Sequence, residues 1–406
     1  MAISAALIFG ALGIAAFTFL DMTGRLGFLP DFSASQSFLR AIPFGGFFFW
    51  FHTVISYIFI KVIIYILLYY MNDKATALKV FVWVQLAVAV ESALKVTFGG
   101  SRPCFDGSAL PGSGCSCSYG QPSGHMLLAT LFYLIIVFDI LIPKARGAWK
   151  YIYGALCIST LFFVGVSRVY YGVHTWSSVI SGFFWGLLLF GLASTLHTPL
   201  VDSFKDLLTM DATFASRRTR SAIFYIIAFI FLNAVTIFGW LRLTRGFENR
   251  SPHPFSGTVC GQSCLAIQGH FADYSLETIA SANAAMFLLI VWLGTKPPYT
   301  PFSFVYCRNQ WNGAAVAIKR AIVWILISLP IFLGYYFAIK FNGWTSYILI
   351  NICGFIWALA FRYAMVPTLK SFKANIEGDF FCNTHGPANR IYAELKENVN
   401  TPNFRI

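Results

Sequence analysis

Long apolar runs separated by short polar stretches dominate this sequence. A helix needs about 20 apolar residues to cross the hydrocarbon core of a bilayer, and runs near that length recur along most of the chain. They lie at about 2–20, 46–70, 76–97, 126–142, 148–166, 175–196, 221–241, 276–295, 319–340 and 346–366. The pattern predicts an all-α fold, a polytopic membrane helix bundle with about nine to ten transmembrane helices.

The composition supports a membrane protein. The chain has 406 residues, of which 57% are hydrophobic and 11% are charged, whereas about a quarter of the residues of a soluble domain are charged. The first 20 residues lack the basic region of a secretory signal peptide and are interpreted as a first membrane helix. The predicted organisation is N-terminal transmembrane segments over 1–75, a core with the polar motifs over 76–200, C-terminal transmembrane segments over 201–369 and a polar tail over 370–406.

The net charge of +13, and the loops in which the lysines and arginines lie, indicate which side of the membrane each loop faces. Membrane proteins gather lysine and arginine in their cytoplasmic loops. The excess of positive charge therefore does not require a nucleic acid partner. If the loops alternate between sides, the basic stretches at 217–220 and 319–320 share one side with the tail. We expect that side to be cytosolic and the polar motifs to face the lumen.

Several cysteines fall in loops predicted on the luminal side: Cys104, Cys115, Cys117, Cys260 and Cys264. Disulfide bonds there would fit an oxidising compartment. Free thiols in packed loops are the alternative, because the sequence does not give their geometry.

The first of three polar islands contains Lys95, Arg102 and Pro103 at the end of an apolar run. Taken alone, Lys95 fits a lysine that extends from a helix end to the membrane surface. With the Arg102 guanidinium nearby, the two cations match a tetrahedral oxyanion. Glu91 precedes Lys95 by one helical turn and can pair with it and hold it in place.

The other two islands lie at the ends of later apolar runs. Pro122-Ser123-Gly124-His125 leads directly into an apolar segment, and the N-terminus of such a helix attracts anions. Ser167-Arg168 ends the next run, and His174 opens the one after it. Read alone, Ser123 is a helix cap and His125 a boundary residue.

Together the islands predict phosphoryl transfer. An imidazole held at His174 can attack phosphorus and form a phosphoryl-enzyme that water later hydrolyses. His125 can protonate the leaving oxygen. No metal or other cofactor is needed, because fixed positive charges can stabilise the transferred group. The candidate phosphate-binding residues are Lys95, Arg102, Ser123, Gly124 and Arg168.

In order and spacing, the islands resemble the signature of the type 2 phosphatidic acid phosphatase superfamily, K-x6-R-P, P-S-G-H and S-R-x5-H-x3-D. That superfamily includes lipid phosphate phosphatases, glucose-6-phosphatases and vanadium haloperoxidases. The resemblance covers residues 95 to about 178, and it implies a helical phosphatase core with His174 as nucleophile, His125 as acid and the other motif residues around the phosphate. One position departs from the signature: Ser178 stands where most members have the aspartate that orients the nucleophilic imidazole. A serine can accept a hydrogen bond there but carries no charge.

The leading hypothesis is an integral membrane phosphatase that cleaves a phosphomonoester at the luminal face of the endoplasmic reticulum or another endomembrane. The substrate is a sugar phosphate such as glucose 6-phosphate or a lipid phosphate. Glucose-6-phosphatases resemble this chain in having nine or ten helices and in the pairs Phe98-Gly99 and Val366-Pro367. The main alternative is an inactive superfamily member that serves as a structural subunit, for which Ser178 is the argument. A transporter of phosphate-bearing solutes is the third. The predicted contacts are the substrate and membrane lipids.

Overall fold

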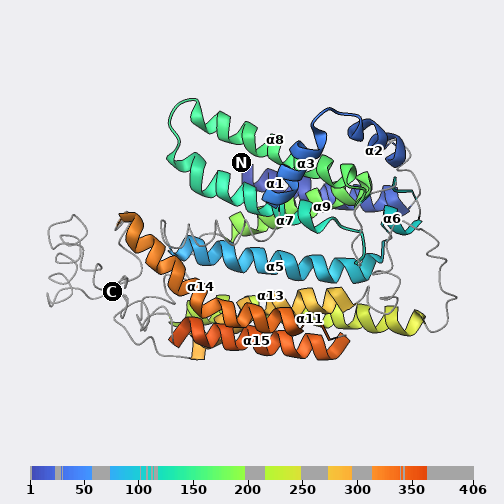
Figure 1. Cartoon of the computed structure of the whole chain (residues 1–406). Coiled ribbons are helices and arrows are strands. Elements are labelled where there is room, and N and C mark those ends of the chain that lie inside the picture. The colour runs from blue at the N-terminus through green and yellow to red at the C-terminus, as the bar shows by residue number, and fades with distance from the viewer. Residues whose placement is uncertain are drawn as a thin grey trace, which may run out of the picture.

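The computed structural model describes residues 2–22, 29, 31–56, 74–100, 102–106, 108–110, 113, 118–196, 215–247, 273–294, 313–338, 340–341 and 343–363. All regular secondary structure within these residues is helical (Figure 1). The predicted fold class, an all-α bundle of membrane helices, is therefore confirmed.

The helices follow the apolar runs closely. The N-terminal half contains α1 (Ala2–Met22), α2 (Phe32–Arg40), α3 (Gly45–Ser56), α5 (Lys74–Phe98), α6 (Pro103–Asp106), α7 (Gly124–Leu134), α8 (Trp149–Tyr170) and α9 (Trp176–Thr195). A π-helical segment, Ile135–Leu141, and a 3₁₀ turn, Ile142–Lys144, extend α7. The C-terminal half contains α11 (Ala215–Phe247), α13 (Asp273–Gly294), α14 (Gly313–Ala338) and α15 (Gly343–Tyr363).

Seven helices in the described part of the chain are long and apolar enough to cross a membrane. The count becomes eight if α2 and α3, which meet at 112°, form one broken span. Shorter apolar helices cover 5–20 and 325–338. The expected number of nine to ten stays a prediction, because the second half of the expected span 46–70 lies outside the described residues. So does the expected tail at 370–406.

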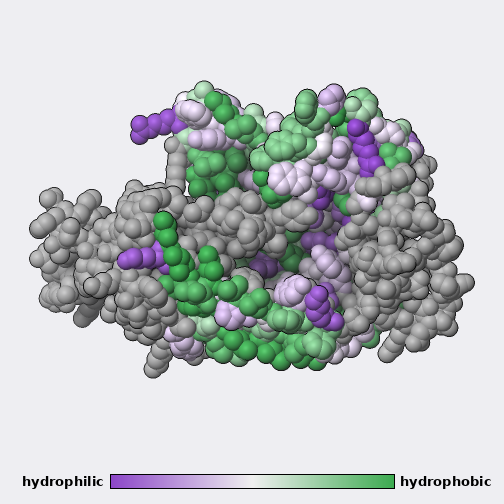
Figure 2. Space-filling model, viewed as in Figure 1, coloured by the Kyte–Doolittle hydropathy of each residue, from purple (hydrophilic) through white to green (hydrophobic). Residues whose placement is uncertain are grey.

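Helix α5 lies between two groups of helices (Figure 1). It contacts α7 on one side and both α11 and α13 on the other. In the first group α1 packs along α9, and α3 packs against α8; in the second, α15 packs against α13 and α14. Hydrophobic side chains cover much of the described surface in the view of Figure 2. Such an apolar exterior suits contact with lipid.

Close packing of α7 against α9 depends on two glycines one helical turn apart. A Cβ atom added to Gly182 would lie 2.6 Å from the carbonyl oxygen of Ser123, and one added to Gly186 would lie 2.6 Å from the carbonyl oxygen of Leu127. Small residues four apart let membrane helices approach closely. The Ser123 amide also donates to the carbonyl oxygen of Ser178 at 2.9 Å. This contact brings the start of α7, in the second island, against the first turn of α9, in the third.

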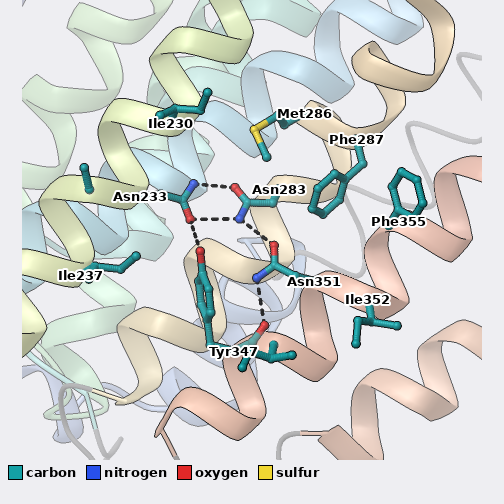
Figure 3. Close-up of a pocket in the computed structure, with 12 residues that line it drawn as sticks. Ile230, Asn233, Ile237, Asn283, Met286, Phe287, Tyr347, Asn351, Ile352 and Phe355 are labelled. Atoms are coloured by element: carbon teal, nitrogen blue, oxygen red, sulfur yellow. Dashed lines mark hydrogen bonds between the residues drawn. The ribbon is translucent and has the colours of Figure 1, made fainter. Parts of the chain in front are cut away.

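The C-terminal helices are joined by a polar network midway along their lengths (Figure 3). Asn233 of α11 and Asn283 of α13 exchange hydrogen bonds of 2.7 and 3.0 Å. Asn283 also donates to Asn351 of α15 at 2.8 Å, and the Tyr347 hydroxyl donates to Asn233 at 2.8 Å. These residues line a mostly apolar cavity of about 680 Å³ that contains no island residue. Polar groups inside a membrane need such partners, so the network holds α11 and α15 onto α13.

We expect Gly182→Ala to lower the free energy of unfolding by about 1–3 kcal/mol, the usual cost of overpacking, because its methyl group would meet the Ser123 carbonyl oxygen. The measurement is the thermal unfolding midpoint of the purified protein in detergent. Gly154→Ala on α8 is the matched control, because a Cβ there meets nothing within 4 Å and alanine favours helix by up to about 1 kcal/mol. Equal midpoints for the two variants would contradict the close packing of α7 and α9.

Candidate active site

The first and third islands meet at Arg102. Its side chain is 3% exposed, and its Nε and Nη2 atoms donate to the carbonyl oxygen and the hydroxyl of Ser118 at 2.5 and 2.7 Å. Its Nη1 donates to the carbonyl oxygen of Val173 at 2.9 Å and lies 3.3 Å from Nε2 of His174. One guanidinium therefore connects the segment after α5 with the turn between α8 and α9.

The hydrogen bonds of His174 determine which ring nitrogen carries the proton. An arginine can only donate, so Nε2 of His174 accepts from Arg102 and is unprotonated. On the other side of the ring, Ser178 Oγ lies 3.4 Å from Nδ1. The Ser178 hydroxyl donates its own proton to the carbonyl oxygen of Thr175 at 2.9 Å, which leaves an oxygen lone pair for Nδ1–H. Both contacts place the proton on Nδ1.

His174 is also neutral. Burial lowers its pKa well below the ordinary value, and the charges of Arg102, Lys95, Arg168 and His125 lower it further. Both causes disfavour the imidazolium. Nε2 is thus unprotonated, as a nucleophile requires, and its lone pair accepts the hydrogen bond from Arg102.

Lys95 lies in the last turn of α5 and is 3% exposed. Its Nζ is 2.7 Å from Oε1 of Glu91, the pairing expected from their spacing. The Glu91 carboxylate packs on Gly124, the first residue of α7: a Cβ atom there would lie 1.8 Å from Oε1. Only glycine fits at this point. The hydroxyl of Ser123, the residue before α7, is buried and has no hydrogen-bond partner.

Arg168 and His125 complete the predicted set. Arg168 is 4% exposed, and its Nη2 donates to the Thr53 hydroxyl of α3. The Tyr171 ring centroid lies 5.9 Å from its Cζ. His125 is half-buried in the first turn of α7, close enough for its charge to act on His174. Residues from all three islands therefore lie near one another at adjacent helix ends.

Two neighbours of the site were not found by sequence reasoning. Thr53 lies within an apolar run, and nothing in the sequence indicates that its hydroxyl accepts a hydrogen bond from Arg168. Tyr274 comes from the start of α13, and its ring centroid is 5.2 Å from Nζ of Lys95, within cation–π range. Its side chain is 42% exposed. The second helix group thus supplies one aromatic ring beside Lys95.

A buried amide supports the loop in front of the site. Gln36 of α2 is fully buried and donates to the Ser113 hydroxyl at 2.8 Å and to the carbonyl oxygen of Tyr170 at 3.2 Å. Its Oε1 accepts from the Leu110 amide at 2.9 Å. Helix α2 therefore braces both the loop after α6 and the end of α8.

The charged groups of the site suit an anion. Lys95, Arg102 and Arg168 are all buried, and Glu91 is the acidic side chain paired with one of them. Within the described residues, no group of three or more His, Cys, Asp or Glu side chains could hold a metal ion.

Comparison with known families agrees with the motifs. Residues 76–201 match the model of the PAP2 superfamily. All three islands lie inside this segment, and the family resemblance predicted from them is confirmed.

The chain is also similar to a curated protein and to a solved structure, both from Bacillus subtilis. Phosphatidylglycerophosphatase B of Bacillus subtilis (strain 168) is 38% identical over 77 residues, which are 18% of this chain and 37% of that protein. The chain therefore spans little more than a third of that relative's length. The crystal structure of a transmembrane PAP2 type phosphatidylglycerolphosphate phosphatase from Bacillus subtilis aligns with 48% of this chain and 96% of its own, at 22% identity and a TM-score of 0.38.

The contact between Ser178 and His174 predicts the effect of restoring the aspartate. In Ser178→Asp a carboxylate would face Nδ1 and favour the imidazolium, so the pKa of His174 should rise. Histidine-labelled protein titrated by NMR would report the change. Ser177→Asp is the control, because Ser177 bonds Thr175 and not the imidazole. An unchanged or lowered pKa of His174 in Ser178→Asp would contradict the contact.

Proposed function

We propose that this protein is an integral membrane phosphatase that hydrolyses a phosphomonoester through a phosphohistidine intermediate. The observation that carries the proposal is His174: a buried, neutral imidazole whose Nε2 lone pair lies beside the Arg102 guanidinium. A fold with one positioned histidine and several buried cations suits phosphoryl transfer better than transport, which gains little from a nucleophile.

In the first step Nε2 of His174 attacks phosphorus, and the bond between phosphorus and the ester oxygen breaks. The departing electron pair stays on that oxygen, which takes a proton from His125. The Arg102, Arg168 and Lys95 cations hold the remaining phosphoryl oxygens, where charge builds up in the transition state. Arg102 is already within 3.3 Å of Nε2, so it would lie beside the reacting phosphorus.

In the second step water attacks the phosphohistidine. His125, now neutral, takes a proton from the water, the P–N bond breaks and its electron pair returns to Nε2 of His174. Inorganic phosphate leaves, and both histidines regain their starting protonation. Ser178 serves this cycle by accepting from Nδ1–H, which keeps Nε2 available each time. This role argues against reading the missing aspartate as a sign of an inactive protein.

The substrate is a phosphate ester of a lipid or a sugar. The similarity to a phosphatidylglycerophosphatase supports a lipid phosphate, whereas the features shared with glucose-6-phosphatases support a sugar phosphate. Phosphate release from lysophosphatidate, phosphatidate, phosphatidylglycerophosphate and glucose 6-phosphate, measured in parallel on purified protein, distinguishes the two classes.

We further propose that the site faces the lumen of the endoplasmic reticulum or another endomembrane, with the tail in the cytosol. Two observations support this orientation. If the loops alternate between sides, the basic stretches at 217–220 and 319–320 share the side of the tail, and Cys104, next to the first island, is in a disulfide bond. Disulfide bonds persist in oxidising compartments. The other cysteines predicted in luminal loops, Cys115, Cys117, Cys260 and Cys264, lie outside the described residues.

Replacing each of the two histidines by alanine should affect a different part of the reaction. His174→Ala should abolish the phosphoryl-enzyme, because the nucleophile is gone. His125→Ala should lower turnover of an alkyl phosphate by about 10²–10⁴-fold, the usual contribution of a general acid, yet should still form the phosphoryl-enzyme from p-nitrophenyl phosphate, whose leaving group needs no proton. Rapid-quench labelling with ³²P measures the phosphoryl-enzyme in both variants.

Orthovanadate, which imitates the transition state, should inhibit the wild type. If the wild type neither takes up label nor binds orthovanadate, the structural-subunit alternative holds.

The orientation has its own test. A tag placed after residue 380 should be accessible to antibody when only the plasma membrane is permeabilised, because we expect the tail to be cytosolic. A tag inserted at residue 108, near the disulfide-bonded Cys104, should become accessible only after the endomembranes are opened. The reverse pattern would place the site in the cytosol.

A further inference from the structure

A carboxylate from α5, that of Glu91, lies against the start of α7, where the sequence predicts a phosphate. Glu91 is 7% exposed, and its Oε1 is 2.7 Å from the Lys95 ammonium. Both carboxylate oxygens would lie within 2.5 Å of a Cβ atom on Gly124. Glu91 therefore touches the first residue of a helix whose N-terminus favours anions.

The same place keeps a hydrogen-bond donor that Glu91 does not use. Ser123 occupies the position before α7, yet its hydroxyl makes no capping bond. The hydroxyl is fully buried and has no partner. A buried polar group without a partner costs free energy unless something binds it. A phosphoryl group, with three outer oxygens, can accept from Ser123 and from Lys95 at the same time.

We propose that Glu91 is an internal counter-anion: it neutralises Lys95 while the site is empty, and the phosphoryl group displaces it from Lys95 on binding. This inference rests on the proposed phosphatase function and deepens it. An empty site with Lys95, Arg102 and Arg168 all buried needs a compensating charge. When the phosphate leaves, Glu91 pairs with Lys95 again, which weakens the hold on the product and favours its release.

The loss of Glu91 changes anion affinity in opposite directions in the two cases: when the phosphoryl group displaces Glu91, and when Glu91 only positions Lys95. If Glu91 only fixed the Lys95 side chain, its loss would leave the lysine misplaced and would weaken anion binding. If Glu91 competes with the anion, its loss strengthens binding. Apparent affinity falls in proportion to the fraction of molecules with an open site, so a site open in about one molecule in ten binds about tenfold more weakly than one always open.

The test is the affinity of the full-length protein in detergent for orthovanadate and for inorganic phosphate. In Glu91→Gln, which keeps the side-chain shape without the charge, we expect both to bind about tenfold more tightly. Asp139→Asn is the matched control, because Asp139 lies in the π-helical segment after α7, outside the site, and should leave both affinities unchanged. Equal or weaker binding by Glu91→Gln, with the control unchanged, overturns the inference.

A second measurement uses the wild type alone and does not depend on how well the variant folds. In protein labelled with ¹³C-glutamate, infrared difference spectra should show a change in a glutamate carboxylate band when orthovanadate binds, because Glu91 leaves the Lys95 ammonium. Orthovanadate binding with no change in any glutamate band overturns the displacement and leaves the phosphatase proposal intact. If the wild type neither binds orthovanadate nor takes up the ³²P label, both proposals are removed.

Discussion

Burial of positive charge is the constraint on which the rest of this structure depends. Lys95, Arg102 and Arg168 are each at most 4% exposed in a chain built for a membrane. An unpaired buried cation costs several kcal/mol, so each needs partners supplied by the fold. Lys95 has Glu91, Arg102 has the carbonyl oxygens of the loop and of the α8–α9 turn, and Arg168 has the Thr53 hydroxyl.

The ends of helices supply some of these partners. Carbonyl groups are free to accept only where a helix has ended, and Arg102 uses this at Val173, in the turn between α8 and α9. The glycines of α9 then bring its first turn against the start of α7. The cations, the two imidazoles and the helix N-terminus consequently lie at one end of the packed helices.

The second group of helices is more than a membrane anchor beside the segment that matches the PAP2 superfamily. Helix α13 contacts α5 and places the Tyr274 ring beside Lys95. The asparagine network fixes α11 and α15 on that same helix (Figure 3). Since uncharged amides satisfy one another at the middle of the bundle, these helices stay joined without a charge inside the membrane.

The sequence by itself determined the helical membrane class, the approximate bounds of most helices and the resemblance to the PAP2 superfamily. Apolar length is a local property, and the motif residues have a fixed spacing along the chain, so both can be read without coordinates. It also predicted the pair of Glu91 and Lys95, because one helical turn separates them. Only the tertiary structure placed Arg102 on Nε2 of His174, the Glu91 carboxylate on Gly124, and Thr53 and Tyr274 beside the cations. Those contacts join residues of different helices, and which side of one helix meets another is decided by packing of the whole bundle, where small residues such as Gly182 set the distance of approach.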